Sequence, residues 1–195
     1  MNLYYPCIIG LWIVHSSVGF SPLSFSSKNV RASLKLHSEP ASSVDDLMDN
    51  IKTRFNVFQK SREQGYSGKQ IIADVIAGEY NSEKTKEKME ELINSAPCVV
   101  FTWERSPSCV KALKAFDLMN ANVKTYRLDN PWSEGNQLRA ELGKRVGRTS
   151  VPFVFIDGEY IGGYDGGTGE DKPGMVDLAF KGTLQTLLKN AGAIS

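Results

Sequence analysis

The chain has 195 residues, of which 41% are hydrophobic, and its 23 Lys and Arg residues nearly balance its 22 Asp and Glu residues. This length gives room for one compact domain with extensions. Nucleic-acid recognition requires a concentrated basic face, and a net charge of +1 offers no sign of one, so the composition argues against that function.

The N-terminal part of the chain predicts a targeting segment in two parts. The apolar run at 7–14 is too short to span a bilayer, and small residues follow it, which predicts a signal peptide over 1–19. Residues 20–40 are rich in serine and have no acidic residue before Glu39, a composition typical of a transit peptide. This order resembles the bipartite presequences of algae with complex plastids, diatoms among them, and implies import into a plastid. Secretion is the alternative.

Residues 41–80 predict a helical extension that precedes the main domain. Apolar residues fall on one face of a helix over 45–64, and a shorter helix begins at Ser67 or Gly68 and stops at Gly78. We expect these apolar faces to pack on the domain that follows; binding of a partner is the alternative. The apolar face of the first helix consists of Val44, Leu47, Met48, Ile51, Phe55 and Phe58.

Residues 82–195 predict one domain of alternating helices and strands. The helix that joins the first two strands makes them parallel, and Asp157 with Gly158 forms a tight hairpin between the last two. The glycine-rich loop at 162–173 has no P-loop lysine after it, so it does not predict a phosphate site. The expected elements are helix 82–95, strand 98–102, a helix from Pro107, strand 123–128, a helix from Ser133, strands 151–156 and 159–161, and helix 174–189, in which we expect Val176, Leu178, Ala179, Leu184 and Leu187 to be buried.

The strand, turn and helix at 97–116, PCVVFTWERSPSCVKALKAF, carry the main chemical signal. Ser106 is a good N-cap and Pro107 suits the first helical position. The first turn of a helix leaves N–H groups unpaired at the positive end of the helix dipole, and a thiol there is stabilised as thiolate. With the Val-Lys-Ala that follows, this segment resembles the glutaredoxin family, which has Cys-Pro-Tyr-Cys at the turn. In that resemblance Cys109 takes the second cysteine position and Ser106 takes the first, the position of the nucleophile.

Two further motifs carry the same resemblance. Ser150, Val151 and Pro152 match the family's Thr-Val-Pro, and the segment 162–165 matches its Gly-Gly-x-Asp turn. The resemblance implies an α/β fold of the thioredoxin-like type over 82–195, with three layers and a four-stranded mixed sheet flanked by helices. Trp103 departs from the family, which usually has a lysine there, and Ser108 replaces an aromatic residue.

The resemblance also implies a glutathione site. A cis bond at Pro152 would turn the Val151 backbone outward to pair with an extended tripeptide. Glycines let the chain approach a ligand closely, and a guanidinium at Arg139 suits a carboxylate. The implied glutathione-binding residues are Arg139, Ser150, Val151, Pro152, Gly162, Gly163, Tyr164 and Asp165.

The serine at position 106 leaves the chemistry to Cys109. A helix terminus does not acidify a hydroxyl into a useful anion, so thiol exchange at Ser106 is excluded. Cys109 is either an inert buried thiol or a slow thiol that accepts glutathione. The family's iron–sulfur cluster uses the first cysteine as ligand, so we expect neither a cluster nor another metal. Cys98 is expected to be buried and too far from Cys109 for a disulfide.

Two functions of different class follow. The first is a glutathione-dependent thiol–disulfide oxidoreductase of cell redox homeostasis, which would act on glutathionylated or disulfide-bearing proteins with Cys109 as its thiol. The alternative is a non-catalytic module that binds glutathione or a peptide in the same groove. Neither requires nucleic acid, and no membrane span is expected in the mature form.

Overall fold

The computed structural model describes residues 43–195. The predicted signal peptide (1–19) and the transit-like segment (20–40) lie outside the described residues, so both stay predictions. Within residues 43–195, no helix combines the length and the apolar character needed to cross a membrane.

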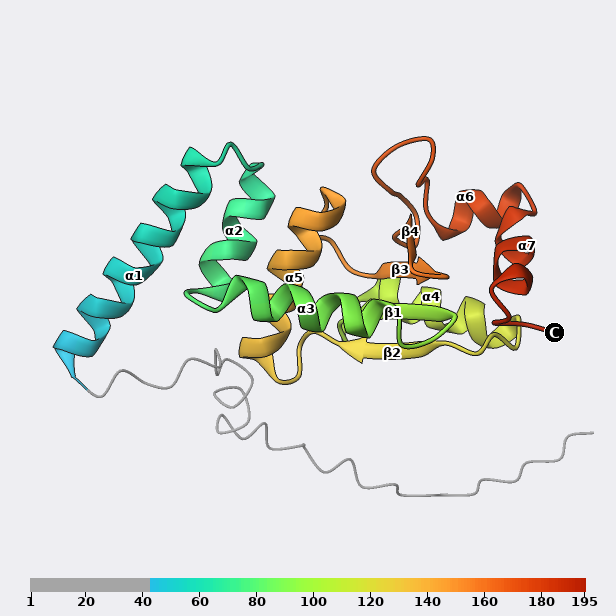
Figure 1. The fold of residues 1–195 in the computed structure, drawn as a ribbon, viewed down its shortest axis with the longest axis horizontal. Coiled ribbons are helices and arrows are strands. Elements are labelled where there is room, and N and C mark those ends of the chain that lie inside the picture. The colour runs from blue at the N-terminus through green and yellow to red at the C-terminus, as the bar shows by residue number, and fades with distance from the viewer. Residues whose placement is uncertain (1–42) are drawn as a thin grey trace, which may run out of the picture. The chain divides into compact units, whose positions relative to one another are not determined.

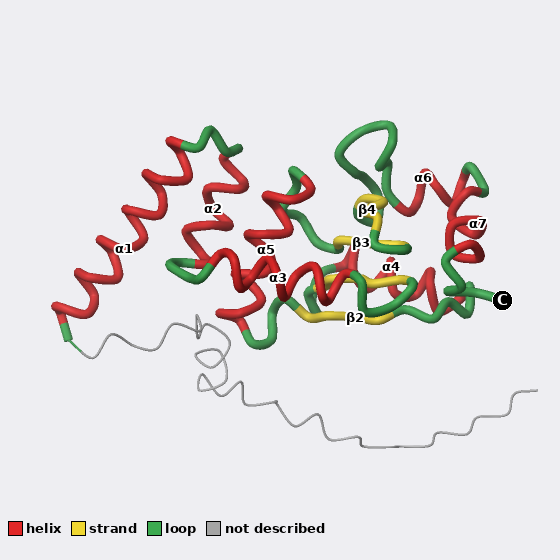
Figure 2. The backbone as a smooth tube through the Cα atoms, in the orientation of Figure 1, coloured by secondary structure: helices red, strands yellow, loops and turns green. Residues whose placement is uncertain are grey.

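The described elements follow the predicted order of helices and strands (Figures 1 and 2). They are α1 (Val44–Glu63), α2 (Gly68–Ala77), α3 (Ser82–Ile93), β1 (Cys98–Thr102), α4 (Pro107–Leu118), β2 (Lys124–Arg127), α5 (Trp132–Val146), β3 (Phe153–Ile156), β4 (Glu159–Gly162), α6 (Met175–Phe180) and α7 (Thr183–Asn190).

The four strands form one mixed sheet in the order β2-β1-β3-β4. Strands β1 and β2 are parallel because α4 connects them, whereas β3 runs antiparallel to both β1 and β4. Asp157 and Gly158 both have positive φ, 51° and 74°, which is the conformation that a two-residue hairpin requires. The predicted hairpin is therefore confirmed.

Alternation along β1 divides the core into two halves. Cys98 and Val100 point to one face of the sheet, where Ala112 and Phe116 of α4 and residues of α6 and α7 cover them. Val99 and Phe101 point to the other face, which α3 and α5 cover. Because both faces are covered, β1 is a continuous apolar run, and the predicted three-layer α/β fold is confirmed.

The predicted last helix, 174–189, is wrong as a single element. Lys181 and Gly182 separate α6 from α7, and Gly182 has φ +71°, in the left-handed region that ends a regular helix. Because of this break, the residues of α7 that face the core differ from those that one continuous helix would place there. Of the residues predicted to be inward, Leu184 is buried but Ala179 and Leu187 are exposed, whereas Met175 and Leu188 are buried instead.

The N-terminal helices also differ from the expectation. Helix α2 packs along α5 and α1 packs on α2, as Figure 1 shows. However, α1 makes this contact with polar groups: Ser61 donates to the Asp74 carboxylate, and Arg54 donates to the carbonyl of Val75 at 2.8 Å. The apolar face of α1 was expected to pack on the domain; it is exposed instead, from 39% at Phe58 to 75% at Val44.

Candidate functional site

The turn between β1 and α4 is built as the sequence predicts. Ser106 is the N-cap of α4, in an extended conformation, and its Oγ accepts the backbone N–H of Cys109 at 3.4 Å. Pro107 occupies the first helical position, where its missing N–H is not needed. The Ser106 hydroxyl therefore serves as a helix cap, a structural role that differs from that of a nucleophile.

The thiol of Cys109 points from α4 back towards the end of β1. Its Sγ accepts the backbone N–H of Trp103 at 3.5 Å, and the residue is only 1% exposed. A thiolate at this position would gain that hydrogen bond and the positive end of the helix dipole. It is nevertheless covered, so a disulfide does not reach it in this conformation.

Arg139 joins three parts of the site. Its guanidinium carbon lies 4.7 Å from the centroid of the Trp103 ring, and its Nε donates to the carbonyl of Thr149 at 2.9 Å. Burial lowers the pKa of Arg139, although a guanidinium stays charged at any ordinary pH. The ring of Trp132 lies on Trp103 at 6.0 Å between centroids. Trp103, which stands where the resemblance predicts a lysine, thus positions Arg139, the residue predicted to bind a carboxylate. The bond to Thr149 occupies one of the five N–H donors of Arg139.

The Ser-Val-Pro segment meets the glycine turn. The Val151–Pro152 peptide bond is cis, as predicted. A Cβ on Gly163 would lie 3.2 Å from the carbonyl oxygen of Pro152 and 3.1 Å from a guanidinium nitrogen of Arg148, so glycine permits the close approach. The N–H of Gly163 donates to the carbonyl of Gly166 at 2.8 Å, which closes the turn. The two predicted motifs, far apart in sequence, therefore lie in contact.

Tyr164 connects the glycine turn with α4. It packs against the core cluster on the α4 side of the sheet, and the Nζ of Lys111 lies 6.0 Å from its ring centroid. Backbone N–H groups at the start of α6 donate to the carbonyls of Gly163 and Tyr164, at 2.9 Å each. The turn is thus fixed between α4 and α6, with Asp165 exposed at its tip.

Two basic residues at this site were not predicted from the sequence. Arg148 donates through Nη1 to the carbonyl of Gly166, so it connects the Ser-Val-Pro segment with the glycine turn. Lys111 faces Tyr164 from α4. A basic residue directly before Thr149 is visible in the sequence, but nothing there shows that its side chain crosses to position 166. Together with Arg139, these residues place three cationic side chains at the site. Ser150, the first residue of the Ser-Val-Pro segment, is half-buried at this site.

Cys98, the other cysteine of the described residues, has a structural role. Cys98 is fully buried in β1, and desolvation raises the pKa of its thiol to about 12. Both Cys98 and Cys109 are free thiols, as expected. Across residues 43–195, no group of three or more His, Cys, Asp or Glu side chains is placed to hold a metal ion.

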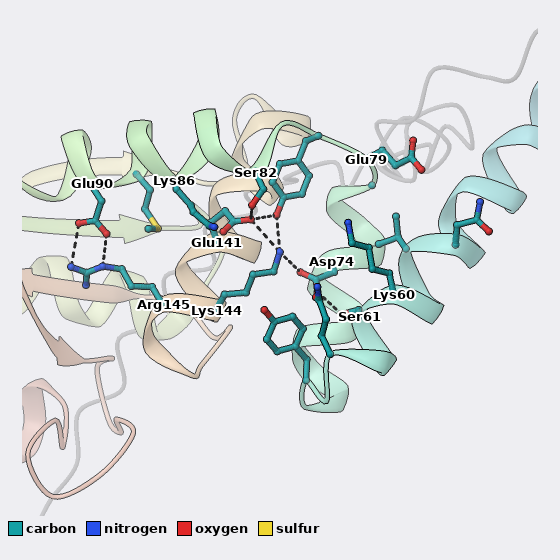
Figure 3. A pocket seen from close by; sticks show the side chains of 17 residues that line it. Lys60, Ser61, Asp74, Glu79, Ser82, Lys86, Glu90, Glu141, Lys144 and Arg145 are labelled. Atoms are coloured by element: carbon teal, nitrogen blue, oxygen red, sulfur yellow. Dashed lines mark hydrogen bonds and ion pairs between the residues drawn. The ribbon is translucent and has the colours of Figure 1, made fainter.

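A separate cavity of about 880 Å³ lies among α1, α2, α3 and α5 (Figure 3). None of the predicted glutathione-binding residues lines it. Glu141, 1% exposed, accepts hydrogen bonds from Tyr80 at 2.6 Å, Ser82 at 2.8 Å and Lys144 at 3.1 Å. The Lys144 ammonium also lies 3.5 Å from the carboxylate of Asp74. These bonds attach α2 and the start of α3 to α5, the helix that carries Arg139.

The Glu141 network predicts an acid-sensitive contribution to stability. Burial raises the pKa of Glu141, but the hydrogen bonds from Tyr80, Ser82 and Lys144 outweigh it, so the net pKa is lowered. A carboxylate with a lowered folded-state pKa contributes stability above its unfolded pKa of about 4.3, and loses it as pH falls through the folded value. We expect the free energy of unfolding, measured by urea denaturation, to fall below about pH 4.5 and to fall less steeply in Glu141→Gln. Glu91→Gln, at an exposed position, is the control and should keep the wild-type slope.

This fold and this site define a class of protein. A mixed four-stranded sheet between helical layers, a thiol at the start of the helix after β1, and a cis-proline before β3 are the features of a thioredoxin-like redox protein. The glutaredoxin family model matches residues 98–161, from β1 to β4.

Similar proteins place the chain within that class. Glutaredoxin-C6 of Oryza sativa subsp. japonica is 37% identical over 108 residues, which cover 55% of this chain and 88% of the relative. Glutaredoxin-C2 of Arabidopsis thaliana is 35% identical over 109 residues, which cover 56% of this chain and 90% of the relative. The buckwheat glutaredoxin–glutathione complex is 32% identical with a TM-score of 0.52, covering 58% of this chain and 96% of that one. The chain belongs to the glutaredoxin family.

Proposed function

We propose that this protein is a glutathione-dependent thiol–disulfide oxidoreductase in which Cys109 is the reacting thiol. The observation that carries the proposal is the joining of the cis-proline segment, the glycine turn and Arg139 around the start of α4. The buckwheat relative was solved with glutathione, which supports the same ligand here.

The residues of this site suit the groups of glutathione. The backbone of Val151 would pair with the extended tripeptide, and Arg139 would bind the glycine carboxylate. The turn at Gly163 and Tyr164 would hold the charged end of the glutamyl group together with Asp165. These backbone and charged contacts would suit a short peptide with a carboxylate at each end.

The exchange would proceed at Cys109 in two steps. The Cys109 thiolate attacks the glutathione sulfur of a mixed disulfide, and the substrate thiol leaves as thiolate and takes a proton from water. A second glutathione thiolate then attacks the glutathione sulfur bound to Cys109, which releases glutathione disulfide and restores the Cys109 thiolate. The N–H of Trp103 would stabilise the thiolate in both steps. Since Sγ is covered, we expect the exchange to be slow.

A second function has one observation in its favour. The 1% exposure of Cys109 suits a module that binds glutathione or a peptide without exchange. In that case the site binds its ligand without exchange, and Cys109 is a buried residue of α4 like Ala112 and Phe116.

The test measures glutathione transfer to the protein. The full chain, in a Cys7→Ser background, is incubated with glutathione disulfide and followed by intact mass. We expect slow addition of one glutathionyl group, lost in Cys109→Ser and kept in Cys98→Ser. If Cys109 stays unmodified while calorimetry detects glutathione binding, the protein is a binding module. If it neither reacts with nor binds glutathione, both functions are wrong.

A further inference from the structure

Helix α1 carries an apolar stripe that the rest of the described chain leaves uncovered. Its members recur on one side of the helix: Val44 (75% exposed), Leu47 (51%), Met48 (48%), Ile51 (52%), Phe55 (56%) and Phe58 (39%). The rings of Phe55 and Phe58 stack at 6.4 Å between centroids. Soluble proteins seldom leave such a continuous stripe in water, so it marks an interaction surface.

The contacts that hold α1 leave the stripe uncovered. Helix α1 holds α2 through Ser61 and Arg54, and Ser61 is buried against Asp74. Both contacts lie in the second half of α1, which packs beside α2 (Figure 1), and every residue of 44–52 is exposed. The apolar stripe is therefore uncovered along the whole helix, a length of about 30 Å.

The charges along α1 indicate which partner the stripe fits. Acidic residues predominate in its first half and basic residues in its second half. The first half has Asp45, Asp46 and Asp49 with Lys52, and the second half has Arg54, Lys60 and Arg62 with Glu63. A surface whose two halves carry opposite charge complements a second copy of itself when the two copies run antiparallel.

We propose that α1 is a self-association surface on which α1 of a second copy packs antiparallel. This arrangement places the aromatic end of one stripe, Phe55 and Phe58, against the aliphatic end of the other, Val44 and Met48. A parallel arrangement would instead oppose like charges along the whole helix and would place Phe58 against its own copy. The two stripes would bury on the order of 1,000 Å², which reaches the lower limit for specific interfaces.

The first test measures the mass of the full chain by sedimentation velocity at micromolar concentrations. We expect a dimer that dissociates on dilution. Phe55→Asp, at the aromatic end of the stripe, should raise the dissociation constant by about tenfold or more, because both copies lose the contact. Phe180→Asp is the matched control: Phe180 is 89% exposed on α6, and its loss should leave the dimer unchanged. Circular dichroism shows whether each variant is folded.

The second test addresses orientation by charge reversal. In the antiparallel pair Asp45 of one copy lies near Arg62 of the other. We expect Asp45→Arg and Arg62→Asp each to weaken the dimer, and the double variant to restore it. A parallel pair gives a different result, because each single reversal would leave the opposed like charges in place and the double variant would restore nothing.

Three results would overturn the proposal. They are a monomer at about 100 μM in full-chain protein, a dimer that folded Phe55→Asp leaves unchanged, and single reversals that the double variant does not rescue. Folded Phe55→Asp as a monomer beside a dimeric Phe180→Asp supports it. None of these readouts depends on glutathione, so the failure of the proposed function would leave this inference standing.

Discussion

Replacing Ser106 with Cys is expected to raise the rate of glutathione-linked disulfide reduction by at least about a hundredfold over the wild type. Position 106 is the N-cap of α4, and its side-chain oxygen already accepts the N–H of Cys109. A thiolate there would accept the same N–H and would lie at the positive end of the helix dipole, which lowers its pKa. Position 106 is also half-exposed, whereas Cys109 is covered.

The measurement is the rate at which a glutathionylated peptide is reduced, coupled to glutathione disulfide formation and recorded across pH. The rate in Ser106→Cys should level off at a lower pH than that of a free thiol, whose pKa is about 8.5. Ser108→Cys is the matched control, because it adds a thiol within the same turn at a position that does not cap the helix. If Ser106→Cys reacts no faster than Ser108→Cys, the proposed glutathione-binding residues do not present the ligand to the start of α4.

Much of this domain follows from local sequence signals. The strand at Cys98–Thr102 lies between Pro97 and a polar loop, so its limits are visible in the composition alone. The cap at Ser106 and the hairpin at 157–158 follow from residues whose side chains or φ angles suit only a few conformations. These features are local, and each is specified within a few residues.

The parts that could not be predicted depend on distant segments. Periodicity shows that α1 has an apolar face, but it does not show whether the chain itself covers that face. The bonds from Tyr80 and Ser82 to Glu141 join residues that are about sixty positions apart in the sequence, and no motif indicates them. The role of Arg148 likewise depends on a carbonyl at position 166 that the fold brings to it.

Gly135→Ala is expected to destabilise the fold by about 3 kcal/mol, although alanine in a helix is ordinarily more stable than glycine by about 1 kcal/mol. Gly135 lies in α5, where a Cβ would come 2.0 Å from the carbonyl oxygen of Leu128 and 2.4 Å from its carbonyl carbon. Both are backbone atoms, and the N–H of Leu128 is in turn bonded to the carbonyl of Thr102 at 2.8 Å. The clash cannot be relieved by a side-chain rotation, so α5 must move away from the sheet.

The loss of stability in Gly135→Ala is measured as the free energy of unfolding by urea, and Gly68→Ala is the matched control. Gly68 lies in the first turn of α2, where a Cβ would meet nothing within 4 Å, so that variant should be neutral or slightly more stable. An unchanged stability of Gly135→Ala would mean that α5 tolerates the displacement.

The same substitution is expected to affect the site. Arg139 is one turn further along the same face of α5 and rests on Trp103, directly after β1. A shift of α5 therefore displaces Arg139, the residue proposed to bind the carboxylate. We expect the glutathione affinity of folded Gly135→Ala to fall together with its stability, whereas Gly68→Ala should keep the wild-type affinity and stability.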